Sequence, residues 1–139
     1  LGRGKVISRK DLQNFPGDYP VYSSSKIGEG KFGEYGKYDF DEDLITWSVD
    51  GGGKFFIRNK HKFSITNVTG YIRILKKNEL SYNYLYVILN YYHSKIKFDW
   101  IKKAHPSVIR KEYTNIPIID FDKQISMVAK LKNIAGRVL

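Results

Sequence analysis

Short strand-like segments separated by turns occupy residues 19–76, and they constrain the fold more than any other feature of the sequence. The first extended segment, 19–22, contains Pro20, which argues against a central position for this segment in a sheet. The spaced glycines of residues 23–36 predict a long loop. Segments rich in β-branched and aromatic residues then predict four short strands and a compact β region, with the strands at 44–49, 55–57, 63–66 and 71–75.

Helical spacing appears before and after this β region. Ser8 and Asp11 are placed to cap a turn of helix within residues 5–16. Apolar residues recur at helical spacing over 79–98, which predicts a helix that begins near Ser81. A short element at 108–114 and an extended segment at 115–119 follow. A final helix runs from Phe121, and its heptad spacing fits either an amphipathic helix packed on its own domain or the start of a coiled coil, through Val128, Leu131, Ala135 and Val138.

The length and composition fit one folded domain. A chain of 139 residues with 42% hydrophobic residues is long enough to bury a continuous core. Cysteine is absent, which excludes disulfides, thiolate metal sites and cysteine nucleophiles. No apolar stretch reaches the length of a membrane span, and no charged-then-apolar leader is visible. We therefore expect a soluble, cytoplasmic protein.

The positive charge is concentrated in one segment. The net charge is +10, and residues 51–110 hold 12 basic and 2 acidic groups, which equals the whole surplus. A basic segment on a folded domain suggests a polyanionic partner, with nucleic acid first and an anionic membrane second. The alternative is a solvated basic surface without a partner.

Catalytic motifs are weak or incomplete. The glycine pattern of 28–33 matches nucleotide-binding loops, but the residues after it are poor helix formers and no other kinase motif occurs. His61, His93 and His105 are spaced too widely for a zinc pair. The acids of 39–43 could hold magnesium or form a solvated turn, and the turn is favoured. We expect no catalysis, no metal and no cofactor.

The candidate nucleic-acid contacts are basic or small polar residues in and around the glycine-rich segments. Lysines neutralise phosphates, and serines beside glycines allow the backbone to approach them. Arg58 and Lys62 could also bond to guanine edges. The predicted set comprises Ser24, Ser25, Lys26, Lys31, Lys54, Arg58, Lys60, His61, Lys62, Lys102, Lys103 and His105.

A series of segments follows one order along the chain: the entry motif 18–25, the glycines of 28–36, the strand-and-turn segments 44–51 and 62–66, the helix 82–89, and the closing residues 115–118 and 124–125. In this order they resemble the target recognition domains of type I restriction–modification specificity subunits. The closing segment departs from the family pattern at Ile119, where a second proline is usual, and at Lys123, where glutamate is usual. The resemblance extends over residues 2–130.

The resemblance implies an α+β fold, with a target recognition domain at 1–120 and the start of a long spacer helix at 121–139. It implies a non-catalytic module that binds one half of a split site in double-stranded DNA. Methyltransferase subunits, and through them the restriction subunit, would be its partners, with a second recognition domain or a homodimer through the C-terminal helix. Similar domains occur in single-chain type II enzymes. Recognition residues vary across such families, so no base contact is carried over.

Two hypotheses from other classes stay open at this point. The tyrosine-rich composition, with 11 tyrosines, also suits a protein-interaction module that binds an acidic partner. The acids of 39–43 could serve a small nuclease or nucleotide enzyme. A steep loss of affinity for duplex DNA with rising salt would favour DNA binding over the acidic-partner hypothesis. Undiminished activity of a larger parent protein after Asp41→Ala and Asp43→Ala would dismiss the enzyme.

Overall fold

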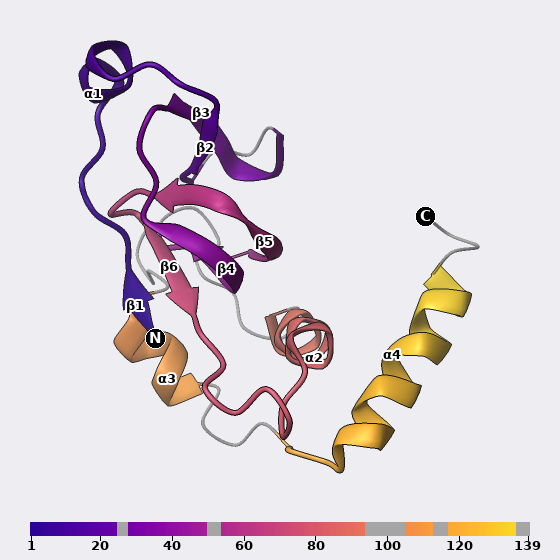
Figure 1. Ribbon diagram of the computed structural model, residues 1–139. Helices are drawn as coiled ribbons and strands as arrows, with labels where there is room; N and C mark the ends of the chain where they lie inside the picture. The colour runs from indigo at the N-terminus through magenta and orange to yellow at the C-terminus, as the bar shows by residue number, and fades with distance from the viewer. Residues whose placement is uncertain (25–27, 50–53, 94–104, 113–116, 136–139) are drawn as a thin grey trace.

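The computed structural model of the chain describes residues 1–24, 28–49, 54–93, 105–112 and 117–135 (Figure 1). One six-stranded sheet forms its centre, in the strand order β1-β6-β4-β5-β2-β3. The strands β2 and β5 are parallel, and the other neighbours are antiparallel. The strand bounds are β1 Gly2–Arg3, β2 Tyr19–Tyr22, β3 Lys31–Tyr35, β4 Phe40–Ser48, β5 Phe55–Ile65 and β6 Thr69–Ile72. Together with the helices, this sheet gives the α+β fold that was expected.

Four helices and one 3-10 turn complete the described structure. Ser8 caps α1, and its hydroxyl accepts from the Asp11 amide while the Asp11 carboxylate accepts from the Ser8 amide, which confirms the predicted capping pair. The 3-10 turn η1 precedes β3. The bounds are α1 Arg9–Asn14, η1 Gly28–Gly30, α2 Tyr82–His93, α3 Pro106–Glu112 and α4 Phe121–Ala135. Among these described helices, none is long and apolar enough to cross a membrane.

The main core lies between one face of the sheet and the helices, and we call this face the helix face. Ile45 and Trp47 of β4 pair with Ile57 and Phe55 of β5, so their side chains share a face. Leu85 and Leu89 of α2 and Ile109 of α3 pack against them in one buried cluster. At the far end, Val21 of β2 packs with Leu12 of α1 on the same face. Gly33 of β3 leaves room there, because a Cβ atom on it would meet the Leu12 side chain at 2.6 Å.

The opposite face, which we call the open face, carries a different set of side chains. Leu44, Phe63 and Ile65 form a small buried cluster, with Tyr22, Phe40 and Tyr71 half-buried above it. The Phe40 ring stacks on Phe63 and lies beside Tyr71. In the part of the chain that the structure describes, no helix packs on this face. Its outer layer is therefore aromatic and accessible.

The strand predictions need three corrections. Residues 31–35 form β3 rather than part of a long loop, because they pair with β2 from Tyr19 to Tyr22. The predicted strands at 55–57 and 63–66 belong to one continuous strand, β5. Its polar middle stays in the sheet because Asp41 and Glu42 of β4 pair with Lys62 and His61.

The third correction concerns β2, which lies between β3 and β5 and not at an edge. Pro20 is tolerated because only Val21 and Tyr22 pair with β5. The predicted strand at 44–49 is confirmed within β4. The predicted strand at 71–75 begins earlier, as β6, and ends at Ile72.

The helix predictions agree with the structure where it is described. The helix that was expected to begin near Ser81 begins at Tyr82, and residues 94–98 of that prediction lie outside the described residues. The short element at 108–114 corresponds to α3, and residues 113–116 lie outside the described part. The final helix begins at Phe121 as expected. The division of the chain into a domain at 1–120 and a spacer helix at 121–139 stays a prediction.

Candidate nucleic-acid interface

A row of cationic and aromatic side chains follows β5 along the open face. Phe56 and Arg58 pair with Thr46 and Leu44 of β4, so they share the face opposite Phe55. Lys54 lies just before β5, and its ammonium group is 5.2 Å from the centre of the Phe56 ring. The register shifts between Leu44 and Glu42 of β4, and the extra residue in β5 places His61 on this face too. The open face thus carries a line of side chains suited to a polyanion.

Arg58 is the most constrained member of this row. Only 4% of the residue is exposed. Its Nε donates to Thr46 Oγ1 at 3.0 Å, and its Nη2 donates to the Glu29 carbonyl at 2.6 Å. The guanidinium carbon lies 3.7 Å from the centre of the Tyr22 ring and 4.6 Å from that of Phe56. Arg58 therefore connects β5, β4, β2 and the turn η1.

The turn that Arg58 holds has an unusual backbone. Glu29 has a φ of 58°, in the left-handed region that few non-glycine residues adopt. The Glu29 carbonyl is fixed by the Arg58 guanidinium, and the Gly30 carbonyl accepts from the Ser23 amide at 2.8 Å. These two bonds hold the glycine-rich segment against the edge of the open face.

Burial changes the protonation chemistry of this group. It lowers the pKa of Arg58 to about 10, against smaller raising effects from Tyr22 and Glu29. The guanidinium therefore remains positively charged at neutral pH. Burial also raises the pKa of the Tyr22 phenol above its ordinary value of 10.0, so Tyr22 remains neutral. The charged Arg58 guanidinium is therefore flanked by two neutral rings, those of Tyr22 and Phe56.

His61 and Ser24 extend the polar network along this face. His61 Nε2 lies 2.8 Å from Tyr22 Oη, and the imidazole stacks on Phe63. Ser24 Oγ donates to the Val68 carbonyl at 3.1 Å and accepts from Ser48 Oγ at 2.8 Å. The glycine-rich segment is thereby joined to the end of β4.

Several other charged side chains near this face are already paired. Lys31 contacts Glu34 at 2.7 Å, and Lys5 contacts Asp39 at 2.7 Å. Arg73 forms a two-bond pair with Glu42, in which its Nη2 lies 2.9 Å from Oε2. Among the described residues, Lys54, Arg58, Lys60 and Lys62 have no carboxylate within 4.0 Å. Lys54 and Lys60 are exposed, so they can meet phosphates without breaking an ion pair, whereas Arg58 is buried.

The acids of 39–43 do not form the expected solvated turn, because residues 40–43 belong to β4, and their contacts account for most of them. Asp39 and Glu42 take part in the pairs above, and Asp43 accepts a hydrogen bond from the Lys60 amide at 2.7 Å. Across the ranges that the structure describes, no group of three or more potential ligands is arranged to hold a metal ion. The glycines of 28–33 are followed by β3 and not by the helix that a dinucleotide-binding loop requires.

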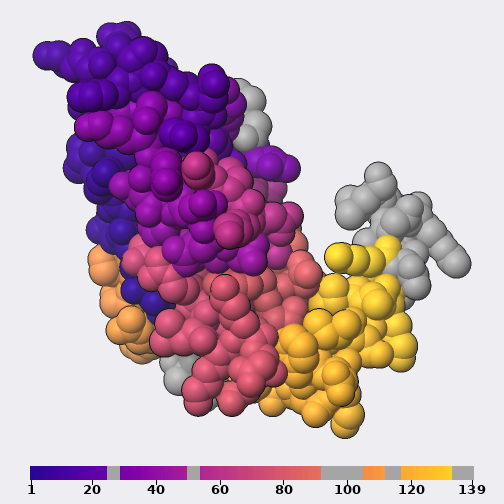
Figure 2. All heavy atoms as spheres, in the orientation of Figure 1, coloured from indigo at the N-terminus to yellow at the C-terminus, as the bar shows by residue number. Residues whose placement is uncertain are grey.

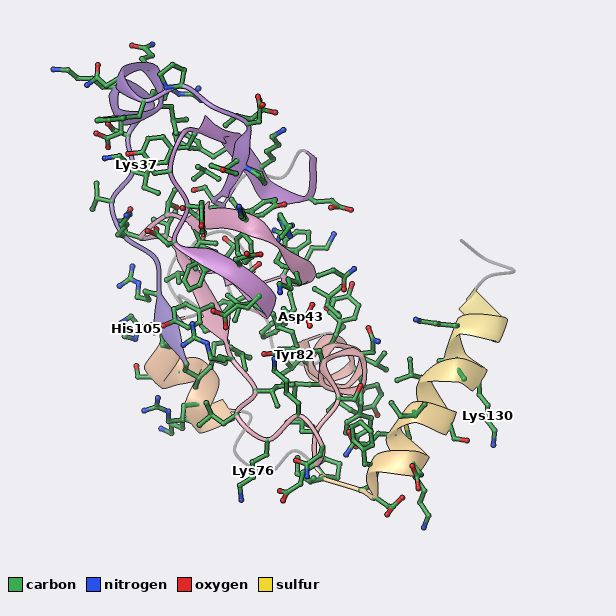
Figure 3. The ribbon with its side chains drawn as sticks, in the orientation of Figure 1. Lys37, Asp43, Lys76, Tyr82, His105 and Lys130 are labelled. Atoms are coloured by element: carbon green, nitrogen blue, oxygen red, sulfur yellow. The ribbon has the colours of Figure 1, made fainter. Side chains whose placement is uncertain are left out.

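The predicted contact residues separate into several groups. Lys54, Arg58 and His61 lie on the open face, and Ser24 lies at its edge. Lys62 lies on the helix face of β5, where its ammonium is 5.2 Å from the Tyr38 ring centre. His105 lies just before α3, in contact with Ser107, and away from the β2–β3 end of the sheet (Figure 3). Lys60 is exposed on β5, and Lys31, the first residue of β3, is paired with Glu34. The other four predicted residues lie outside the described residues: Ser25, Lys26, Lys102 and Lys103.

Sequence reasoning did not identify the aromatic half of this surface. Tyr22 and Phe56 flank Arg58, and Thr46 and Glu29 accept its hydrogen bonds, yet none of the four was in the predicted set. The available signal was the alternation of Lys54, Phe56 and Arg58, which places all three on one face of a strand. The pairing of β2 with β5, which brings Tyr22 there, has no local signal.

The comparisons with known proteins agree with this architecture. Residues 1–134 match the model of a family described as the type I restriction modification DNA specificity domain. The chain is 36% identical over 78 residues to the type I restriction enzyme MpnII specificity subunit of Mycoplasma pneumoniae, covering 55% of the chain and 23% of that protein. It is 37% identical over 87 residues to another protein of that organism, which is assigned in name to the type I specificity subunits (S.MpnORF285P), covering 61% and 28%.

A solved structure shares the fold. The crystal structure of the S subunit of a type I restriction–modification system from M. genitalium superposes with a TM-score of 0.67, at 15% identity, and covers 97% of this chain and 36% of that one. The chain thus spans well under half the length of these proteins. The names confirm the prediction of a specificity component rather than a catalytic one. Because the family model matches nearly the whole sequence, this chain belongs to the type I restriction modification DNA specificity domain family.

Proposed function

We propose that this chain recognises one half of a split site in double-stranded DNA and binds it through the open face of the sheet. The observation that carries the proposal is the row of Lys54, Phe56, Arg58 and His61 along β5, opposite the face that the helices cover. The exposed Lys54 can displace counterions from phosphates, and the buried Arg58 side chain keeps the neighbouring glycine-rich turn in place. Family membership supports DNA as the polyanion.

The role of the bound module is to place other subunits. Because the chain belongs to a DNA specificity domain family, we propose that it directs methyltransferase subunits, and through them a restriction subunit, to its half-site. The helix α4 points out of the domain, as the space-filling view shows (Figure 2), and offers the connection to the rest of a longer subunit.

The first test is binding of a mixed-sequence duplex of DNA by the 139-residue chain at several salt concentrations. Phosphate contacts predict that the logarithm of the affinity falls linearly with the logarithm of the salt concentration, with a slope of about −0.9 for each phosphate neutralised. Polyglutamate serves as the acidic control. Binding to polyglutamate but not to the duplex would contradict the proposal and favour the acidic-protein alternative.

The second test addresses sequence recognition. The chain replaces the corresponding domain of a working two-domain type I specificity subunit, and the methylated sites are read genome-wide. We expect one half of the split site to change and the other half to stay as before. Methylation at the original sites, or none in a folded and assembled enzyme, would show that the chain does not specify a half-site.

A further inference from the structure

A single buried glutamine fastens α4 to the rest of the domain. Gln124 is 0% exposed and lies in the first turn of α4. Its Oε1 accepts from the Ser81 amide at 2.8 Å, and its Nε2 donates to the carbonyls of Glu79 and Ile119 at 2.9 and 2.8 Å. A buried amide that uses both donors and its acceptor is costly to leave unpaired. These bonds join α4 to the turn before α2.

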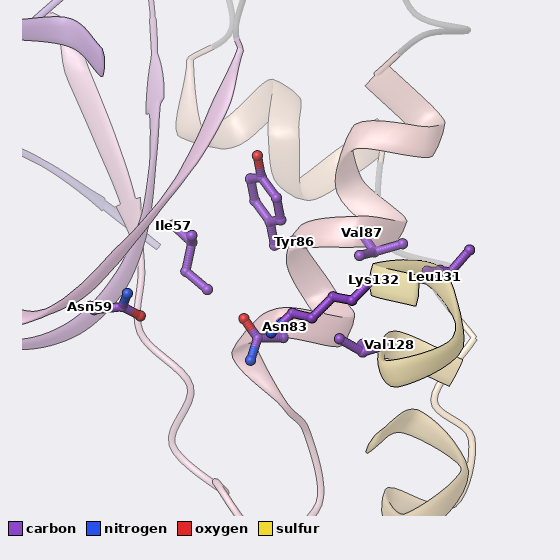
Figure 4. Close-up of a pocket in the computed structure, with 8 residues that line it drawn as sticks. All are labelled: Ile57, Asn59, Asn83, Tyr86, Val87, Val128, Leu131 and Lys132. Carbon is purple, nitrogen blue, oxygen red and sulfur yellow. The ribbon is translucent and has the colours of Figure 1, made fainter. Parts of the chain in front are cut away.

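Apolar packing holds α4 over a short stretch only. Among the described side chains of α4, only Gln124 and Val128 are buried, and Leu131 is 39% exposed. A cavity of about 340 Å³ separates this part of α4 from the sheet, with Ile57 and Asn59 on one wall and Val128 and Leu131 on the other (Figure 4). The contact of α4 with the domain is therefore concentrated at its first turns.

A second polar contact fixes the chain just before α4. Tyr84 of α2 is 1% exposed, and its hydroxyl donates to the Pro117 carbonyl at 2.6 Å. This bond holds the position of the incoming chain but does not touch α4 itself. Gln124 acts on α4 directly, because its three bonds connect the first turn of α4 to two separate backbone segments.

We infer that Gln124 is a positioning residue that sets the angle at which α4 leaves the recognition domain. The 12 residues from Gln124 to Ala135 are separated by 11 helical steps, which extend about 16 Å at 1.5 Å each. A tilt of 20° would move the far end by roughly 5–6 Å, comparable to one or two base-pair steps of DNA at about 3.4 Å each. The consequence for half-site spacing rests on the proposed function, whereas the positioning itself does not.

The test measures, in the 139-residue chain, a distance that depends on this angle. Because the sequence has no cysteine, spin labels can be placed at Lys10→Cys on α1 and Lys130→Cys on α4, both exposed. Gln124→Met keeps the side-chain volume and removes all three bonds. We expect its distance distribution to shift or broaden by several ångströms, while Lys123→Met, an exposed change on the same helix, keeps the original distribution.

A second variant tests the hydrogen bonds without removing them all. Gln124→Glu keeps an acceptor for the Ser81 amide but has no donor for the two carbonyls while it is ionised. Burial raises the pKa of such a carboxyl, and protonation restores one donor. The distribution should therefore be broad above neutral pH and narrow as the pH falls, with the unsubstituted chain unchanged over the same range.

Several outcomes would overturn the inference. A distribution like that of the unsubstituted chain in folded Gln124→Met, or in Gln124→Glu at every pH, would show that apolar packing sets the angle. Complete unfolding of both variants would show that Gln124 is needed for the domain to fold, and not specifically for the direction of α4. Affinity for the DNA duplex should change less than twofold in either variant, so failure to bind DNA would count against the proposed function and leave this inference standing.

Discussion

The two faces of the central sheet carry different side chains on the same strands. The helix face buries Ile45, Trp47 and Phe55 under α2 and α3, with Trp47 and Phe55 fully buried. The open face alternates with it and carries Thr46, Phe56 and Arg58. Because strand side chains alternate, stability and binding can be changed separately on adjacent residues. The helix face holds the larger core, whereas the open face combines a small core with a cationic, aromatic surface.

Phe55 and Phe56 offer a direct comparison of the two faces. Phe55→Ala removes a fully buried ring from the helix face and should cost about 3–5 kcal/mol of unfolding free energy. Phe56→Ala removes a half-buried ring, so it should cost less and should weaken binding to duplex DNA through its contact with Arg58. Chemical denaturation and DNA titration of both variants check this. Equal losses of stability with no difference in DNA affinity would break the comparison.

Arg58→Met should destabilise the protein by about 1–3 kcal/mol, because the variant leaves the Glu29 carbonyl and Thr46 without their buried donor. Arg58→Lys should recover little of this loss, since one ammonium cannot reproduce the planar fork. Denaturation at neutral pH gives the values. Arg9→Met, an exposed change on α1, is the control and should stay within about 0.5 kcal/mol of the unsubstituted chain. An equally small effect at Arg58 would contradict its buried role.

Lys54 and Lys62 compare a cation on each face of the same strand. Lys54→Ala should weaken DNA binding several-fold at low salt and reduce the steepness of the salt dependence by about 0.9, because one phosphate contact is lost. Lys62→Ala should leave both quantities nearly unchanged. Both residues are exposed, so neither change should alter the denaturation midpoint. A larger effect from Lys62 would move the interface to the helix face.

Glu42→Gln should have the smallest effect. The Arg73 hydrogen bond, opposed by partial burial, lowers the pKa of Glu42 below its ordinary value of 4.5. A lowered pKa in the folded state stabilises the protein above the ordinary pKa, and this stabilisation is lost as the pH falls through the folded value. We expect a loss of about 0.2–1 kcal/mol at pH 7, as for exposed pairs, and no difference from the unsubstituted chain in strong acid. A difference that persists in acid would rule out this pair as its cause.

The sequence predicts local features of the fold better than long-range ones. The Ser8 cap and the start of α4 at Phe121 follow from local patterns. The strand β3 was missed because its glycines suggest a loop, whereas the space that Leu12 requires beside Gly33 depends on tertiary packing. The central place of β2 was missed because a parallel partner more than 40 residues away gives no local signal.

The candidate site, like the fold, was only partly predictable from the sequence. Charge identified Lys54, Arg58 and His61, which the structure brings to one face. It could not distinguish Lys62, because the extra residue in β5 that turns this side chain to the other face is not visible in the pattern. It also treated Arg58 as a free cation, although burial between two rings gives it a structural role.

The most direct test of the central claim is to map which face touches DNA. Single cysteines at Lys54→Cys and Lys62→Cys, introduced into this cysteine-free chain, carry a photoactivated cross-linker while a DNA duplex is bound at low salt. An open-face interface predicts efficient cross-linking from position 54 and little from position 62. Efficient cross-linking from position 62, with little from position 54, would contradict it.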